Sequence, residues 1–113
     1  MLSALRGADE ARPIRAAAGT SHDGNPNSLF PSANGEAGDL LLLSQAFDDT
    51  AAQDDFLPPT DMALFRWIAG ADEAGYVFGV ELSDDGPTGE RETQGVGGAN
   101  AKDLMLTIVV AGR

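Results

Sequence analysis

Cysteine is absent from this 113-residue sequence, and histidine occurs once, as His22. The two scarcities exclude disulfide bonds, thiolate nucleophiles and zinc sites built from Cys and His ligands. They leave the redox compartment undetermined. His22 lies in a stretch dense in turn-forming residues, and its neighbours Ser21 and Asp23 cannot form a catalytic triad with it. We therefore expect a solvent-exposed turn residue there and no enzyme activity.

Long apolar runs are also missing from the sequence. Runs such as residues 40–43 are far shorter than the roughly 20 residues that a membrane-spanning helix requires. The first ten residues lack the apolar core of a signal peptide. We therefore expect a soluble protein that is made in the cytoplasm and has no membrane partner.

Basic residues are scarce: seven Lys and Arg stand against eighteen Asp and Glu, for a formal net charge of −11. Nucleic-acid binding depends on a surface rich in Lys and Arg, which this chain cannot assemble. An anionic membrane surface is disfavoured for the same reason. Nucleic acid is therefore excluded from the expected partners.

The residues that are present are those of a folded domain. Hydrophobic residues make up 42% and charged residues 22% of the chain, close to globular averages, while 14 Gly and 6 Pro indicate many turns. The length fits one domain with a single core.

Charge divides the chain into two parts. Residues 1–19 hold three Arg against two acids, a net charge of +1, whereas residues 20–113 have a net charge of −12. The first part is rich in Ala, contains Pro13 and has no sustained periodicity. It predicts a short helical turn near Leu2 to Leu5 followed by an extended arm. A frayed terminus is the alternative.

Beyond this segment, short apolar stretches alternate with clusters of turn formers, a pattern typical of a β-sandwich or barrel. The continuous apolar stretch at residues 40–43 predicts a strand covered on both faces, with a buried helix as the alternative. We expect strands at residues 13–20, 28–30, 39–47, 62–68, 76–82 and 104–110.

Alternation within these strands predicts which side chains share a face. In residues 62–68 it places Met62, Leu64 and Ile68 on one side, with Ala63, Phe65 and Trp67 on the other. In residues 76–82 it places Tyr76, Phe78, Val80 and Leu82 together. In residues 104–110 it separates Leu104, Leu106, Ile108 and Val110 from Met105, Thr107 and Val109. The aromatic residues Phe65, Trp67, Tyr76 and Phe78 are expected in the core rather than on a ligand-stacking surface.

Two segments are expected to be loops. Residues 48–61 contain five acids, no base and a Pro-Pro pair, which predicts a solvated, self-repelling connection. Residues 83–100 are rich in Gly and predict a long loop or a hairpin with a flexible tip. Residues 95–103 resemble a phosphate-binding loop only superficially, because they lack the Gly-Lys-Ser/Thr ending and precede a strand.

Adjacent acids recur along the chain and are expected to stay solvated and ionised, which does not suit glycoside hydrolysis. Calcium stays open as an alternative, because oxygen ligands from these acids could gather around a hard cation. The regular Asp-x-Asp-x-Asp-Gly loop is absent, and we expect no cofactor. The calcium candidates are Asp48, Asp49, Asp54, Asp55, Asp84 and Asp85.

Residues 29–43 and residues 64–78 contain two strings that resemble segments of small β-sandwich domains in tailed-bacteriophage virion proteins. Residues 29–43, LFPSANGEAGDLLLL, are similar to that family's short apolar strand, Pro-containing turn and Ala-Gly-Asp-Leu-Leu-Leu strand. Residues 64–78, LFRWIAGADEAGYVF, are similar to its aromatic strand, Ala-Gly-Ala turn with an acid and Tyr-x-Phe strand. The sequence departs from the family at residues 56–61, where a Pro-Ala-Gly-Trp-type turn is usual. The resemblance covers residues 13–113 and includes no active-site signature.

The resemblance implies an all-β fold, a small antiparallel β-sandwich of jelly-roll type at residues 19–113, with residues 1–18 as an N-terminal arm. It implies a structural protein of the virion, and a single domain with an arm favours a capsid decoration or cement protein on the head surface. The expected partners are the major capsid protein and neighbouring copies of the chain. In the arm, apolar anchors and capsid-pairing arginines are expected at Leu2, Leu5, Arg6, Arg12, Ile14 and Arg15.

The alternative is a tail or baseplate module that binds a neighbouring tail protein, or that binds a host glycan through residues 48–61 and 83–100. A small hydrolase is a third class, for which neither His22 nor the acid pairs supply a mechanism.

Overall fold

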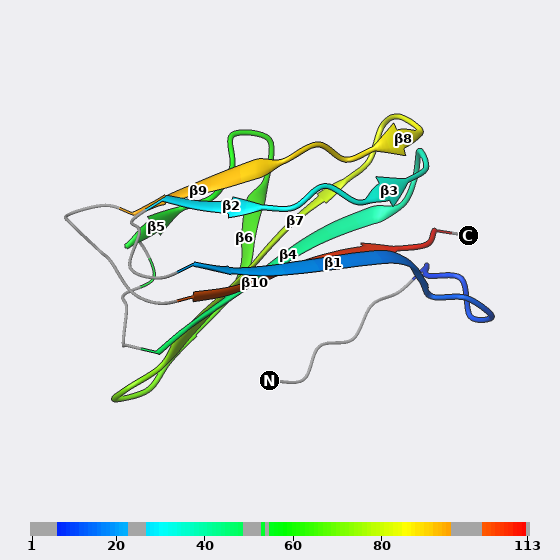
Figure 1. Ribbon diagram of the computed structural model, residues 1–113. Coiled ribbons are helices and arrows are strands. Elements are labelled where there is room, and N and C mark those ends of the chain that lie inside the picture. The colour runs from blue at the N-terminus through cyan, green and yellow to red at the C-terminus, as the bar shows by residue number, and fades with distance from the viewer. Residues whose placement is uncertain (1–6, 23–26, 49–52, 54, 96–102, 113) are drawn as a thin grey trace.

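The structure is a computed structural model, and it describes residues 7–22, 27–48, 53, 55–95 and 103–112 (Figure 1). Within these ranges the chain is all β: every strand pairing is antiparallel, and no helix is present. The all-β, antiparallel prediction is therefore confirmed.

Five long strands form the main sheet, in the order β1-β10-β4-β7-β6. They are β1 (Ile14–His22), β10 (Asp103–Val110), β4 (Leu40–Phe47), β7 (Ala74–Glu81) and β6 (Ala63–Ala69). Each of the five lies within two residues of a predicted strand. The central strand β4 pairs over all eight residues with both β10 and β7.

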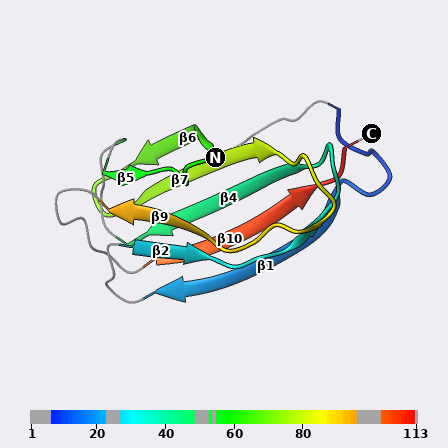
Figure 2. The ribbon, with the colours of Figure 1, turned by 90° about the horizontal axis from the view of Figure 1, so that it is seen from above.

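The remaining strands are short and form two small sheets. β2 (Asn27–Phe30), β9 (Arg91–Gly95) and β5 (Phe56–Leu57) pair in the order β2-β9-β5, while β3 (Asn34–Gly35) pairs with β8 (Gly86–Pro87). Figures 1 and 2 show β2, β9 and β5 lying over one face of the main sheet. We call this covered side of the main sheet the inner face and the opposite side the outer face.

The core lies between the inner face and the small sheet above it. Phe30 of β2 and Phe56 of β5 are buried against it, and the Phe56 ring stacks on Phe47 of β4 with centroids 4.5 Å apart. Tyr76 of β7 meets the same pair edge-on, 5.7 Å from Phe56. The hydroxyl of Thr107 on β10 donates a hydrogen bond to the carbonyl oxygen of Pro31 at 2.7 Å, which joins the two layers.

Alternation correctly separated the faces of β7 and β10. Tyr76 and Phe78 on β7 are fully buried, and so are Met105, Thr107 and Val109 on β10; Val110 on the opposite face of β10 is also buried. The expectation that the 40–43 stretch is covered on both sides is wrong. Leu41 and Leu43 are buried, whereas Leu40 and Leu42 on the outer face are only half-buried, because no second layer covers that face in the described part of the chain.

The predicted faces of residues 62–68 are correct up to Phe65 and wrong beyond it, because the pairing of β6 with β7 shifts between Leu64 and Arg66. This bulge adds one residue to β6 and reverses the alternation beyond it. Trp67 therefore pairs with the inward-facing Tyr76, while Ile68 pairs with the outward-facing Gly75. Phe65 and Trp67 are partly exposed, so only two of the four aromatic residues predicted for the core, Tyr76 and Phe78, are fully buried.

The two predicted loops contain strands. β5 interrupts residues 48–61, and β8 and β9 occupy much of the described part of residues 83–100. Phe56 and Thr93 are buried there, because each strand contributes to the layer above the inner face. Residues 96–100 lie outside the described part of the chain.

The segment before β1 is fastened to the chain's C-terminal end. Ala8 and Gly112 form an antiparallel bridge, and the Asp9 N–H donates to the Ala111 carbonyl at 2.8 Å. Residues 14–18, which we assigned to the arm, lie in β1 and pair with β10. The main sheet therefore begins at Ile14, several residues earlier than the domain boundary that we placed at residue 19.

Candidate functional site

The outer face of the main sheet is the most unusual surface of the described chain, because several large apolar side chains on it are exposed to solvent. On β10, Leu104 is 63% exposed and Leu106 is 39% exposed, although their neighbours Met105 and Thr107 are completely buried. Antiparallel pairing carries this alternation across all five strands, since directly paired residues share a face.

The pairing arranges the outer face into parallel rows. Three of them cross all five strands, and a fourth, which crosses four strands, contains Ile14, Val110, Leu40 and Glu81. One row contains Ser21, Leu104, Ala46, Gly75 and Ile68; the next contains Gly19, Leu106, Ser44, Val77 and Arg66; the third contains Ala17, Ile108, Leu42, Gly79 and Ala63. Arg66 is the single charged residue among these fifteen.

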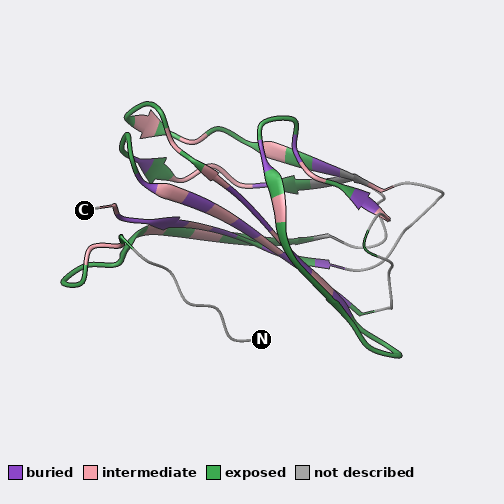
Figure 3. Cartoon of the chain, turned by 180° about the vertical axis from the view of Figure 1, so that it is seen from behind, coloured by how far each residue is buried: buried purple, intermediate pink, exposed green. Residues whose placement is uncertain are grey.

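Phe65 extends the apolar surface at the β6 edge. The residue sits at the bulge and is 52% exposed, and its ring lies against Gly79 of β7. Since Gly79 alternates with the inward-facing Phe78, the Phe65 ring covers the outer face. Figure 3, which shows the molecule from behind, marks exposed residues along β6 and over the turn that joins it to β7.

A shallow hollow of about 300 Å³ marks one end of the outer face. Leu40, Glu81 and Val110 form its floor on three neighbouring strands, and Gly7 and Ala8 border it from the segment before β1. The bridge between Ala8 and Gly112 holds that segment in place.

A polar centre lies at the same end of the sheet as this hollow, around the buried carboxylate of Asp39. The Arg15 guanidinium donates through Nε to Asp39 Oδ2 and through Nη2 to Oδ1 at 3.2 Å. The backbone N–H groups of Glu36 and Gly112 also donate to this carboxylate, at 2.9 and 3.0 Å. The carboxylate thereby joins β1, the turn before β4 and the C-terminal segment.

These contacts shift the ionisation of both side chains. Burial of Asp39 acts to raise its pKa, but the hydrogen bonds from Arg15, Gly112 and Glu36 outweigh burial and hold the pKa below its usual value. The hydrogen bond to Asp39 raises the pKa of Arg15. Arg15 also pairs with Glu36, with Nη1 and Oε1 3.1 Å apart. The Arg15 charge is thus neutralised within its own chain.

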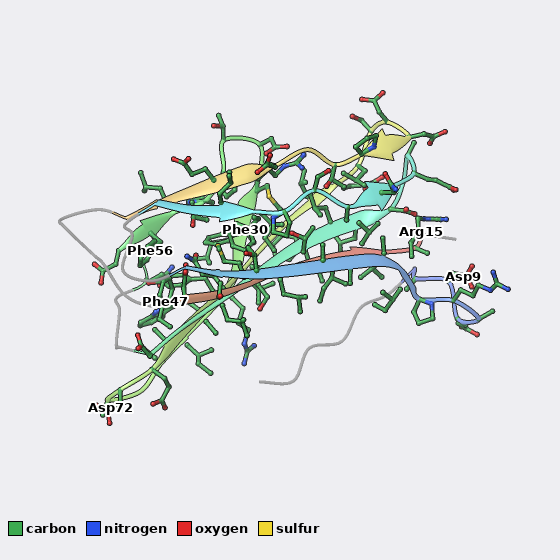
Figure 4. The ribbon with its side chains drawn as sticks, in the orientation of Figure 1. Asp9, Arg15, Phe30, Phe47, Phe56 and Asp72 are labelled. Carbon is green, nitrogen blue, oxygen red and sulfur yellow. The ribbon has the colours of Figure 1, made fainter. Side chains whose placement is uncertain are left out.

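The arm residues that the sequence suggested are not gathered in one place by the structure. Leu2, Leu5 and Arg6 lie outside the described residues. Arg12 is exposed just before β1, and the Asp9 carboxylate accepts hydrogen bonds from the N–H groups of Ala11 and Arg12 there. Ile14 begins β1 and is 54% exposed. Figure 4 shows Asp9 and Arg15 at the same end of the molecule.

A buried polar cluster in the core was not anticipated from the sequence. Gln45 of β4 donates through Nε2 to Asp103 Oδ2 at 2.8 Å and accepts a hydrogen bond from the Thr93 hydroxyl at 3.2 Å. All three residues are buried. The cluster links β4, β10 and β9, so it fixes the small sheet on the main sheet.

The calcium candidates are not gathered either. Within the described ranges, no group of three or more His, Asp or Glu side chains is placed to hold a metal ion. Asp85 instead accepts a hydrogen bond from the Ala37 N–H at 2.9 Å. Asp49, Asp54 and the side chain of His22 lie outside the described part of the structure. No helix in that part is long and apolar enough to cross a membrane.

Comparisons with protein-family models, with curated proteins and with solved structures find no match to this chain. The proposal of a function therefore starts from the outer face of the main sheet.

Proposed function

We propose that this chain is a non-enzymatic structural protein of a tailed-bacteriophage virion, a decoration or cement protein on the outer surface of the head. The observation that carries the proposal is the uncovered outer face. The largest apolar patch on a monomer is usually about 300 to 600 Å² and is often functional, as a contact with another protein. The family resemblance adds the virion as the setting.

The proposed architecture is a β-sandwich. The main sheet and the β2-β9-β5 sheet face each other across a core of aromatic and aliphatic side chains, which is how the two layers of a sandwich are held together. In this interpretation the short β3-β8 pair closes one end of the sandwich, and the chain before Ile14 is the arm.

The arm is proposed to bind the major capsid protein at the boundary between subunits. Arg15 is committed to Asp39 and Glu36, so we assign the capsid-pairing charges to Arg6 and Arg12. Leu2 and Leu5 remain the proposed apolar anchors, joined by the exposed Ile14 at the edge of the sheet. The acidic surface of the sandwich would face solvent.

The arm is tested by removing residues 1–6 and measuring binding to capsids that lack the protein. A longer deletion through residue 18 would remove half of β1 and confound binding with unfolding. We expect the short deletion to abolish capsid binding while the thermal unfolding midpoint stays unchanged. The matched control replaces residues 1–6 with a Gly-Ser sequence of equal length. Full binding by either variant would exclude Leu2, Leu5 and Arg6 as capsid contacts.

A tail or baseplate module is the second candidate, and the arrangement of strand ends favours it. The pairing puts His22, Asp103 and Phe47 in one row, and Phe56 stacks on Phe47 while pairing with Gly95. Several connections between strands therefore start and finish at one end of the molecule, as in binding modules that recognise ligands with clustered loops. A glycan array probed with and without a chelator tests this candidate. Specific glycan binding would support it and would count against the head.

A further inference from the structure

We infer that the outer face is the contact between two copies of this chain, which pack their main sheets face to face as a two-fold symmetric dimer. The inference goes beyond the proposed virion role and does not depend on it, because it rests on the outer face alone. It names a second copy as the occupant of that face.

The charge distribution selects a second copy as the partner. The chain has a net charge of −11, yet the four rows of the outer face contain two charged residues, which are of opposite sign, Arg66 and Glu81. Two copies that met through any strongly acidic surface would repel each other. The outer face lets them meet without opposing their carboxylates. A basic partner, in contrast, would be attracted to the acidic surfaces elsewhere.

Two of the rows of the outer face are complementary in side-chain size between β10 and β4. Leu104 and Leu106 form a ridge along β10, and the neighbouring positions on β4 are the small residues Ala46 and Ser44. Gly75 on β7, which pairs with Ala46, is also small. A two-fold axis that runs between β10 and β4 therefore packs Leu104 and Leu106 of each copy against the small β4 residues of the other copy. Both copies then contribute the same surface, as an isologous contact requires.

The size of the face is close to that of a small dimer interface. Five strands about 4.8 Å apart and three rows about 6.8 Å apart give a footprint of about 500 Å². The accessible area of the projecting side chains exceeds this projection, and Phe65 adds to it at the β6 edge. Specific interfaces bury about 600 to 1,000 Å² on each partner, so the outer face approaches the lower end of that range.

The inference is tested by measuring the mass of the full chain in solution, by sedimentation equilibrium over a range of concentrations. The variants are Leu104→Asp and Leu106→Asp on the outer face. The matched control is Leu57→Asp, because Leu57 is 49% exposed but belongs to β5 in the other layer. We expect a dimer for the original chain and for the control. Each outer-face variant should weaken dimerisation about 100-fold, since it would bury an unpaired carboxylate.

A cross-linking measurement keeps the inference testable if the Asp variants fail to fold. Because the chain contains no cysteine, a single introduced one is unique. Ser44→Cys beside the proposed axis should be joined efficiently by a short bis-maleimide, whereas Ala71→Cys in the exposed β6–β7 turn should not. Equal cross-linking of the two variants would contradict the proposed interface.

Three outcomes would overturn the inference. The first is a monomer at all concentrations, and the second is a dimer unaffected by both outer-face variants. The third is a monomer that dimerises only after residues 1–6 are removed, which would assign the outer face to the chain's own N-terminal segment. Capsid binding is measured separately with empty capsids, so failure of the dimer and failure of the virion role are distinguishable.

Discussion

The ring of Phe65 lies directly against the backbone of Gly79 on the neighbouring strand, so closely that a Cβ at position 79 would overlap the ring. This contact explains why a glycine occupies the middle of β7, where it adds nothing to strand stability. The missing side chain is replaced by an aromatic ring from β6, which extends the apolar outer face to the edge of the sheet.

Gly79→Val should therefore destabilise the fold. The new side chain would displace the Phe65 ring, and because that ring is half-exposed and can turn aside, we expect a loss at the low end of the range for overpacking, about 1 kcal/mol. Gly75→Ala is the matched control on the same strand and face, because its Cβ would meet only the Gln45 carbonyl at an ordinary 3.5 Å. Urea unfolding should show a loss for the first variant and little change for the second; equal losses would show that the ring contact is unimportant.

Asp39→Asn should be strongly destabilising. The substitution removes the charge that Arg15 and two backbone N–H groups satisfy, and hydrogen bonds to a charged group contribute about 1.5 to 3 kcal/mol each without being additive. Glu36→Gln is the control, since Glu36 pairs with the same guanidinium from an exposed position. We expect a loss of about 2 to 4 kcal/mol in the unfolding free energy for Asp39→Asn and under about 1 kcal/mol for Glu36→Gln.

The low pKa of Asp39 predicts how stability changes in acid. The carboxyl pKa is lower in the folded protein than in the unfolded chain, where it is about 3.9, so the unfolded state binds more protons as the pH falls. The stabilising contribution is complete above that pH and disappears as the pH drops through the folded-state pKa. Asp61 acts in the same direction, because its hydrogen bond from Arg91 lowers its pKa.

The measurement is the unfolding free energy between pH 5 and 2, compared for the original chain and Asp39→Asn. The original chain should lose more stability over that interval, which brings the two curves together. Parallel curves would show that Asp39 has the same pKa in both states.

The sequence predicted the long strands well because their alternation is a local property. Tyr76 and Phe78, two residues apart, and Met105 and Val109, four residues apart, were placed on common faces, and the structure buries each pair. The bulge at Phe65 could not be predicted, because it is defined by the pairing of β6 with β7. The same limit applies to β5, whose two residues become a strand through pairing with β9, about 38 residues further along the chain.

The candidate site was only partly predictable. Leu104 and Leu106 were correctly placed on one face, but alternation does not say which face of a strand is covered. Arg15 was chosen for its charge as a partner-binding residue, and its contact with Asp39, 24 residues away, depends on the tertiary fold. Asp39 lies within the Ala-Gly-Asp string of residues 29–43, and that string was the sequence feature that could have drawn attention to this carboxylate.

Phe56→Ala tests whether residues 48–61, the segment with five acids, contribute to the core. Phe56 is buried and stacks on Phe47, so its truncation should cost about 3 to 5 kcal/mol. Leu57→Ala is the neighbouring control, because that side chain points outward from the same short strand. Equally small losses of unfolding free energy for both variants, measured by urea unfolding, would show that residues 56–57 belong to a solvated loop and not to the core.

The most direct test of the proposed function is the copy number of this polypeptide in purified particles of its source virus, measured by quantitative mass spectrometry against the major capsid protein. A decoration protein on the head surface should approach a stoichiometric ratio to the capsid protein. A few copies in each particle would contradict the head location and favour the tail module, and complete absence from the particles would contradict the virion role itself.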